Sequence, residues 1–420
     1  MTTRWWLRMW GLGYVPVGGA SLLVPVYALA LGADAVLVGL LAATAAFAGV
    51  PGAILAGRLA RRADRHRGLV VGAVFGMALT LAGMSLVRDT LALLVLNAGL
   101  WFAVAAAAPV CNLVVVGGAA QDEWDDRLAA LNAVQGWGWV LGLIAGIGWV
   151  AVATTVSPAA AHRSLLLAFA GLSAIAAVGV FWTFPAGPRP SLTRFATRIA
   201  KVGRRDLGAG RIIRLNPLGA GRLYWALRRL DLGGLTAAFR GPTGTFLLGI
   251  GAFALGSAVF WGPMPAYLDG RGLSTTAIFA VFLAANAGSA MTYGRVARLE
   301  PRFGAARLQV AGIGARSILF PAVLLGGAAL WAIGGVFLAV GVSWALAVVT
   351  APLLVARLAP PERRSGVLGT YTAVVSGGTG VGSILGGIVA TAQGFAMAFA
   401  VAGVVVLAGA VLAWRGLNGD

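Results

Sequence analysis

Residues 35–67 read AVLVGLLAATAAFAGVPGAILAGRLARRADRHR, an uncharged apolar run that ends in clustered arginines. Residues 35–56 are long enough for a helix to cross the hydrocarbon core of a bilayer, which takes about 20 apolar residues. Arginines that directly follow such a run are typical of the cytoplasmic side of a membrane. This stretch therefore predicts a transmembrane helix whose second end lies in the cytoplasm.

The same alternation of apolar runs and short polar segments continues through the whole chain. Of the 420 residues, 59% are hydrophobic and 11% are charged, against about 25% charged in soluble domains. The mean hydropathy is +0.88, and a water-soluble core of this size cannot hide so much apolar surface. We predict an all-α membrane protein with twelve transmembrane helices in two six-helix halves. The expected spans are 10–31, 35–56, 68–87, 91–116, 128–153, 164–184, 243–266, 274–293, 308–325, 329–355, 367–391 and 395–414.

The basic residues are sorted to one side of this predicted topology. All but four of the 32 Lys and Arg residues lie in the termini and the even-numbered loops. The exceptions are Arg88, Arg163 and Arg271 in the opposite loops, and Arg316 inside the ninth span. By the positive-inside rule, we expect a multi-pass protein of the cell membrane with both termini in the cytoplasm. The net charge of +19 then reflects topology, and no nucleic-acid partner is expected because no recognition module accompanies it.

The chain divides into an N-terminal half, residues 1–184, a basic linker, residues 185–242, and a C-terminal half, residues 243–420. Residues 194–201 of the linker mix apolar and basic side chains, so they could lie on anionic lipids of the inner leaflet as an interfacial helix. A solvated linker is the alternative. The lipid bilayer and an unidentified small molecule are the expected partners, and we expect a monomer.

Two features of the first half recur in the second. Gly57-Arg58-Leu59-Ala60-Arg61-Arg62 follows the second span, and Gly294-Arg295-Val296-Ala297-Arg298-Leu299 follows the eighth. Glycines also repeat every four residues in the fifth and eleventh spans, at Gly138, Gly142 and Gly146 and at Gly378, Gly382 and Gly386. Because both pairs are separated by nearly the same length of chain, a duplication is predicted. Repeated six-helix halves enclose a site that their rocking exposes to each side in turn.

With these features the chain resembles the major facilitator superfamily over essentially its whole length. Residues 57–67 look like the loop with which that family latches its inner gate through ionic contacts between the halves. The resemblance implies cytoplasmic gate residues Gly57, Arg58, Arg61, Arg62, Asp64, Arg65, Gly294, Arg295 and Arg298. The motif is imperfect, because Arg61 stands where the family has an acid. Asp64 either takes over that pairing or caps the following helix.

Two further positions depart from the proton-coupled drug exporters of this superfamily. Their fifth span carries a glycine–proline motif, but residues 142–147 here read GLIAGI without the proline. Asn97 stands where their fourth span has an arginine before Pro109. Small residues spaced by four also favour close packing of helices. The chain therefore resembles the superfamily without matching that exporter group.

Carboxylates are absent from the predicted spans. All thirteen acidic residues and both histidines, His66 and His162, fall in loops or at span ends. Proton relays in transporters are normally intramembrane Asp, Glu or His, so facilitated diffusion, exchange or coupling to another ion is favoured. Arg316 is the one charge expected inside a span, as a buried charge that binds an anion or acts in gating, or as a structural residue that snorkels or bonds a carbonyl.

Polar and aromatic side chains in the inner spans are the candidates for lining a substrate cavity. Each either bonds a neighbouring helix or contacts a substrate, since a buried amide or hydroxyl needs a partner. Together they suggest a neutral or weakly charged ligand. The candidates are Tyr14, Asn97, Trp101, Asn132, Gln135, Trp261, Asn286, Trp344, Tyr371 and Thr372.

No pattern predicts an enzyme, a cofactor or a metal site. Lys201 is the only lysine and no phosphate loop surrounds it, so ATP-driven transport is not expected. The function predicted is secondary transport of a small molecule by alternating access, with efflux as one direction. The alternative is a transport-inactive membrane sensor or assembly partner that has kept the fold.

Overall fold

The computed structural model describes residues 2–60, 66–117, 123–153, 158–185, 239–327, 329–360 and 364–419, and these ranges contain helices and no strand. Within these ranges, twelve segments are long and apolar enough to span a membrane. The helices of the first half are α1 (Thr2–Ala30), α2 (Ala35–Phe47), α3 (Gly49–Leu59), α4 (His66–Leu86), α5 (Thr90–Val115), α6 (Trp124–Ala153) and α7 (Pro158–Thr183). Those of the second half are α12 (Gly241–Trp261), α13 (Met264–Gly270), α14 (Thr275–Phe303), α15 (Ala305–Ala322), the 3-10 helix η3 (Val323–Gly326), α16 (Leu330–Leu358), α17 (Arg364–Gln393) and α18 (Phe395–Asn418).

Two spans are each built from two helices, and proline explains both breaks. Pro51 lies in the first turn of α3, so it offers no N–H to the last turn of α2. Gly262 and Pro263 separate α12 from α13 in the same way. The predicted division of the apolar stretch 308–355 is confirmed, because η3 ends at Gly326 and Gly327 has a φ of +56°.

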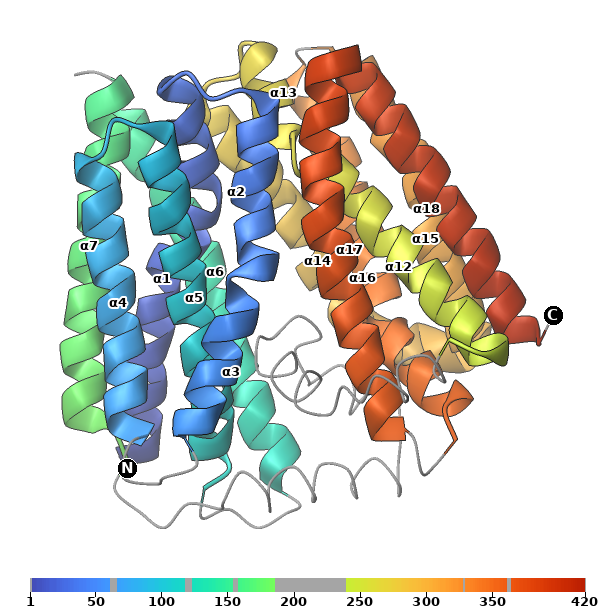
Figure 1. Ribbon diagram of the computed structural model, residues 1–420, viewed down its shortest axis with the longest axis horizontal. Helices are drawn as coiled ribbons and strands as arrows, with labels where there is room; N and C mark the ends of the chain where they lie inside the picture. The colour runs from blue at the N-terminus through green and yellow to red at the C-terminus, as the bar shows by residue number, and fades with distance from the viewer. Residues whose placement is uncertain are drawn as a thin grey trace.

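Helices α1–α7 form one group and helices α12–α18 another, each packed mainly within itself, except that the main neighbour of α2 is α17 of the second group. Figure 1 shows these groups side by side, the first in blue and green and the second in yellow and red. We call them the N-terminal and C-terminal halves. Both ends of the chain lie at one end of the bundle, which we call the terminal end, and α13 marks the opposite, distal end (Figure 1). An even number of spans gives this arrangement.

Turn chemistry at the distal end fixes where several spans begin. The Asp34 carboxylate accepts a 2.8 Å hydrogen bond from the Leu37 N–H, and the Asp89 carboxylate accepts one of 2.8 Å from the Ala92 N–H. Such N-caps satisfy backbone donors that the first turn of a helix leaves unpaired. These two acids therefore have a structural role at the membrane surface.

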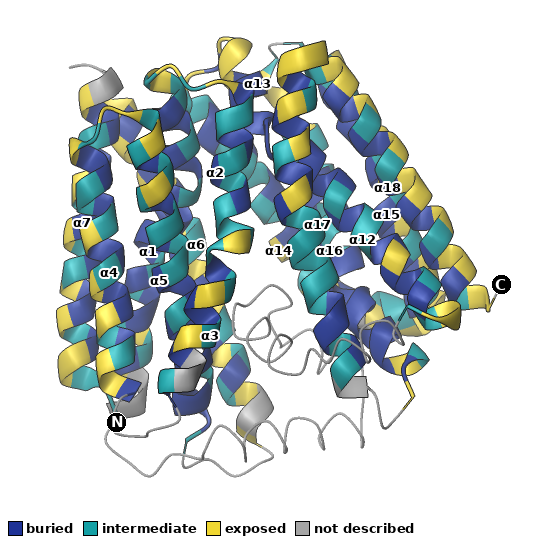
Figure 2. Cartoon of the chain, in the orientation of Figure 1, coloured by how far each residue is buried: buried dark blue, intermediate teal, exposed yellow. Residues whose placement is uncertain are grey.

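Burial follows the pattern expected of a bundle in lipid. Figure 2 shows buried residues where helices face one another and exposed residues on the outer faces. Many of the exposed residues are large and apolar, among them Val95, Trp182 and Trp331. On a soluble protein such a surface would drive association, whereas here it faces the acyl chains.

One predicted loop is wrong. Residues 294–307 were expected to connect the eighth and ninth spans, but α14 continues as a helix to Phe303 and only Gly304 separates it from α15. The sequence signal was a loss of hydrophobicity, which marks the membrane boundary and does not end a helix. Arg302 in the last turn favours the helix C-terminus electrostatically, and Gly304, with a φ of +80°, permits the turn.

Candidate functional site at the interface of the halves

The closest approach between the halves joins α2 to α17 through glycines. A Cβ built on Gly387 would lie 2.8 Å from the Cα of Val36 and would overlap the carbonyl oxygen of Ala35. Likewise, a Cβ on Gly39 would overlap the carbonyl oxygen of Ser383. At these two glycines backbone therefore meets backbone, whereas nearer the middle of the contact the ring of Phe47 on α2 lies against Gly380 on α17. Such a contact can separate and re-form without repacking a core.

A second contact joins α6 and α7 to α14. A Cβ on Gly146 would collide with the ring of Phe279. Nearby, His162 Nε2 and Thr275 Oγ1 are hydrogen-bonded at 3.2 Å. Helix α1 also packs against α13. These contacts and those of α2 with α17 lie between the middle of the bundle and its distal end, so the halves meet there.

The glycines of the predicted repeat mainly pack helices within each half. Gly138 and Gly142 lie against α1, where a Cβ on Gly142 would be 2.5 Å from the Gly19 nitrogen. Gly378, Gly382 and Gly386 lie against α12 in the same manner. The equivalent positions in the two halves thus make equivalent contacts. Gly146 is the exception, since it faces the other half.

The candidate gate residues are only partly described. Gly57 and Arg58 lie in the last turns of α3, while Arg61, Arg62, Asp64 and Arg65 lie outside the described residues, as does the linker from 186 to 238. Gly294, Arg295 and Arg298 lie on α14 and are exposed at the terminal end. Arg295 donates to the Met291 carbonyl of its own helix. The gate thus remains a prediction.

An ion pair on this side of the C-terminal half was not predicted from the sequence. Arg357 Nη2 of α16 donates to Glu300 Oε1 of α14 at 3.1 Å. The two residues are far apart in the chain, and only their position at the ends of neighbouring helices brings them together. The pair fastens α14 to α16 beside the exposed cations of α14.

In the N-terminal half, the cavity candidates are mostly used in helix packing. The Asn97 amide donates to the Leu41 carbonyl at 3.0 Å and to Thr44 Oγ1 at 2.5 Å, which ties α5 to α2. Trp101 lies 6.3 Å from Trp139, ring centroid to ring centroid. Three further candidates lie on α1 and α6: Tyr14 and Asn132 are part-buried and Gln135 is buried.

In the C-terminal half, the aromatic candidates join a cluster of rings. Trp261 contacts Phe260, Phe282 and Phe337 with centroid distances of 5.3–5.4 Å. The other polar candidates make bonds within their own helices or are buried. Asn286 donates to the Phe282 carbonyl, Thr372 donates to the Leu368 carbonyl, and Tyr371 is buried.

Arg316 is buried to 1% exposure among three helices, so it does not snorkel. Its Nε donates to Ser343 Oγ, its Nη1 to Ser257 Oγ and its Nη2 to the Val340 carbonyl, each at 3.1 Å. Trp344 is the cavity candidate beside it, with the guanidinium carbon 5.0 Å from the ring centroid. A cation at this depth costs about 2.5–3.5 kcal/mol to insert.

The partners of Arg316 could not be named from the sequence. Ser257 and Ser343 are single hydroxyls within apolar runs, and this is the only signal they give. Phe253 stacks on Trp344 with centroids 6.0 Å apart and planes at 29°. The cluster of Arg316, Ser257, Ser343, Phe253 and Trp344 therefore comes from α15, α12 and α16 together.

None of the Asp and Glu side chains whose exposure the structure describes is buried. Both histidines are buried, His66 at the start of α4 and His162 in the first turns of α7. Among the described residues, no group of three His, Cys, Asp or Glu side chains is placed to hold a metal ion.

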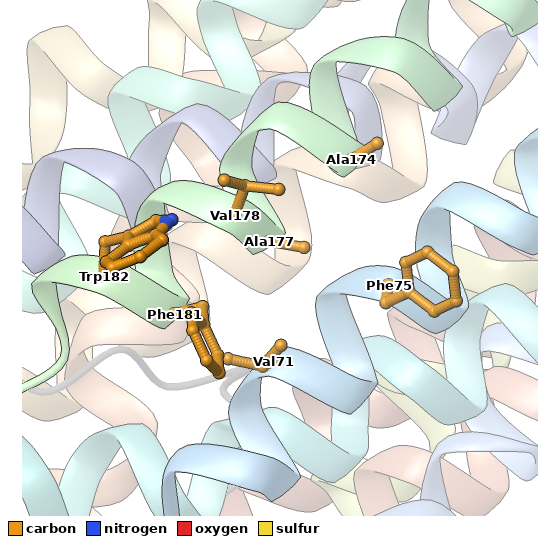
Figure 3. Close-up of a pocket in the computed structure, with 7 residues that line it drawn as sticks. All are labelled: Val71, Phe75, Ala174, Ala177, Val178, Phe181 and Trp182. Carbon is orange, nitrogen blue, oxygen red and sulfur yellow. The ribbon is translucent and has the colours of Figure 1, made fainter.

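A separate groove lies on the outer surface of the N-terminal half, between α4 and α7 (Figure 3). It is lined by Val71, Phe75, Ala174, Ala177, Val178, Phe181 and Trp182. Phe75, Phe181 and Trp182 are exposed, so the groove faces lipid and is not part of the interface between the halves.

Comparison with known proteins decides the family. The model of the Major Facilitator Superfamily matches residues 12–374, which is most of the chain. The chain belongs to the Major Facilitator Superfamily. No curated protein shows detectable sequence similarity to this superfamily member.

Solved structures of transporters share the fold of this superfamily member over its full length. The nucleoside transporter NupG superposes with a TM-score of 0.67 at 16% identity, covering 100% of this chain and 99% of that one. A bacterial homologue of the human lysosomal transporter Spinster, inward-facing and unoccupied, gives 0.70 at 14%, covering 100% and 96%. The human organic anion transporter MFSD10 gives 0.55 at 15%, covering 98% of each chain. Family and fold point to a transporter and not to an enzyme.

Proposed function

We propose that this protein is a secondary transporter that moves a small molecule across the cell membrane by alternating access. The observation that carries the proposal is the position of the contacts between the halves. They lie from the middle to the distal end, and the closest of them is a glycine contact that can open and close. A rocking motion about such contacts would expose the space between the halves to each side in turn.

The charge distribution supports a cytoplasmic terminal end. The exposed cations Arg295, Arg298 and Arg302 lie there, in keeping with the positive-inside rule. With the halves in contact distally, the state described here corresponds to one closed to the outside. The chain acts as a monomer in this proposal, and the linker of residues 185–242 contacts anionic lipids of the inner leaflet.

The family likeness supports transport without choosing the solute. The neighbours named above include a nucleoside transporter and an organic anion transporter, and both are under 25% identical to this chain. The chemical class of the solute must therefore be inferred from the residues of this protein itself.

Transport is tested with the purified protein in proteoliposomes. We expect counterflow of at least one solute from a panel of nucleosides, organic anions and neutral aromatic compounds. Two liposome preparations in which the protein is inserted in opposite orientations are compared under the same solute gradient. The orientation that supports uptake distinguishes export from import. Gly387→Ala should reduce the counterflow, whereas Gly72→Ala, which meets no neighbour within 4 Å, should leave it unchanged. A folded protein that moves no solute would favour the sensor alternative.

A further inference from the structure

The C-terminal half holds a positive charge, that of Arg316, which the described residues around it do not neutralise. The guanidinium of Arg316 has five N–H donors, and the three hydrogen bonds described above use one donor on each nitrogen. All three acceptors are neutral oxygens. Two N–H groups therefore have no acceptor among the described residues.

Among the residues that the structure describes, no carboxylate forms an ion pair with Arg316. The carboxylates of described exposure are all at least partly exposed, and they belong to helix ends and connecting segments. If Arg316 served only to tie α15 to α12 and α16, an amide would make similar bonds without the cost of burying a charge. The charge itself needs an explanation.

Aromatic rings surround the guanidinium, and one of these rings is partly exposed. The centroids of Phe253, Phe320 and Trp344 lie 5.4, 5.5 and 5.0 Å from its central carbon. Phe253 and Phe320 are buried, but Trp344 is only partly so. A solute that reaches the indole is thus separated from the charge by one ring, which stacks on Phe253 and lies over the guanidinium.

We propose that Arg316 recognises an anionic group, a carboxylate or a phosphate, on the solute that the protein transports, and that Trp344 covers this site when it is empty. Displacement of the indole lets the anion take the two unused N–H donors, a geometry that guanidinium groups favour for these anions. The indole and Phe253 then contact the apolar part of the solute. This inference rests on the proposed transport function and names its substrate class.

Binding is measured first, without transport, on the purified full-length protein in detergent. Benzoate and phenyl phosphate are the probes, and benzamide is the uncharged probe of the same shape. We expect at least one of the two anions to raise the midpoint temperature of thermal unfolding and to change the tryptophan fluorescence. Benzamide should do neither. Arg316→Gln should weaken binding of the anion by about 10- to 100-fold, the usual worth of a charged hydrogen bond.

Arg271→Gln is the matched control, because it removes an exposed arginine of the same half and should leave the affinity unchanged. Trp344→Ala provides a second test should Arg316→Gln fail to fold: it uncovers the guanidinium, so we expect anions to associate faster, while the loss of the indole contact with the apolar part of the solute speeds dissociation as well. The inference is overturned if neither anion binds, if Arg316→Gln binds it as well as the wild type, or if Trp344→Ala leaves association unchanged.

Proteoliposomes separate this inference from the transport proposal. Anion binding that depends on Arg316, with no counterflow of any solute, would leave the inference standing as a binding site and refute transport. Counterflow of neutral solutes that Arg316→Gln does not alter would uphold transport and refute the anion site. Counterflow of benzoate or phenyl phosphate that Arg316→Gln reduces and Arg271→Gln does not would support both.

Discussion

Gly387→Ala should shift the protein away from the state in which α2 and α17 are in contact. The added Cβ would lie 2.8 Å from the Cα of Val36, whereas carbon atoms pack comfortably at about 3.5–4.0 Å. The helices must therefore move apart by about 1 Å. The neighbours it meets are backbone atoms of Ala35 and Val36, which cannot rotate away as a flexible side chain can.

The size of the shift in the conformational equilibrium depends on which state contains the steric overlap of the added Cβ. Overpacking of this kind costs about 1–3 kcal/mol, and all three nearest atoms belong to the other half, so the cost falls only on the state closed at the distal end. The helix propensity gained by replacing glycine, about 1 kcal/mol, is the same in both states. The equilibrium should thus move by about 5- to 150-fold toward distal opening.

Distances between spin labels measure this shift directly. Arg88 and Arg271 are exposed at the distal end of opposite halves, so labelled cysteines at these positions report its opening. Cys111 is the only cysteine and is buried, and Cys111→Ala supplies the background. We expect Gly387→Ala to lengthen the distance distribution and Gly72→Ala to leave it unchanged. An identical distribution in both variants would show that the glycine contact does not control opening.

Three further predictions concern the rest of the molecule. Asn97→Ala should lower the free energy of unfolding by about 0.5–2 kcal/mol, because it removes the hydrogen bonds from α5 to α2, and it should leave the solute affinity unchanged. Thermal unfolding measures the first effect and a binding assay the second. A loss of affinity with unchanged stability would place Asn97 in the solute site. Glu300→Gln should change stability by less than about 1 kcal/mol, as expected for a partly exposed ion pair, and a denaturation midpoint far below that of the wild type would contradict this. Collapse of an imposed proton gradient by an ionophore should leave net solute uptake unchanged, since no carboxylate of described exposure is buried. Complete loss of uptake would reveal a proton carrier, either a buried histidine, His66 or His162, or a residue outside the described ranges.

The sequence predicted the spans well because each span is a local property. Apolar length and flanking charge set where a helix enters and leaves lipid, and the division at Gly326-Gly327 was found in this way. The errors lie where helices leave the membrane. Helix α1 begins at Thr2 and not near residue 10, because Trp6, next to the basic residues Arg4 and Arg8, packs against Phe184 with ring centroids 6.0 Å apart.

The candidate site was less predictable, because a polar residue in a span has two possible partners. Asn97 was chosen correctly as a residue that needs hydrogen bonds, yet the structure gives it a neighbouring helix. Trp344 was chosen for its aromatic ring, but its position above a buried cation depends on three helices. Residue type indicates a requirement, whereas packing decides how the requirement is met.

Hydrophobic length and the placement of arginines determined, from the sequence alone, that the chain crosses the membrane twelve times, because the bilayer acts on each segment separately. The tertiary structure decided which faces of those helices meet. Arg316 bonds Ser257 and Ser343, which lie 59 and 27 residues away in the chain, and Gly387 meets Ala35 of the other half. The sequence around these residues does not indicate either partner, because the neighbours of a helix face are decided only when the helices pack into the bundle.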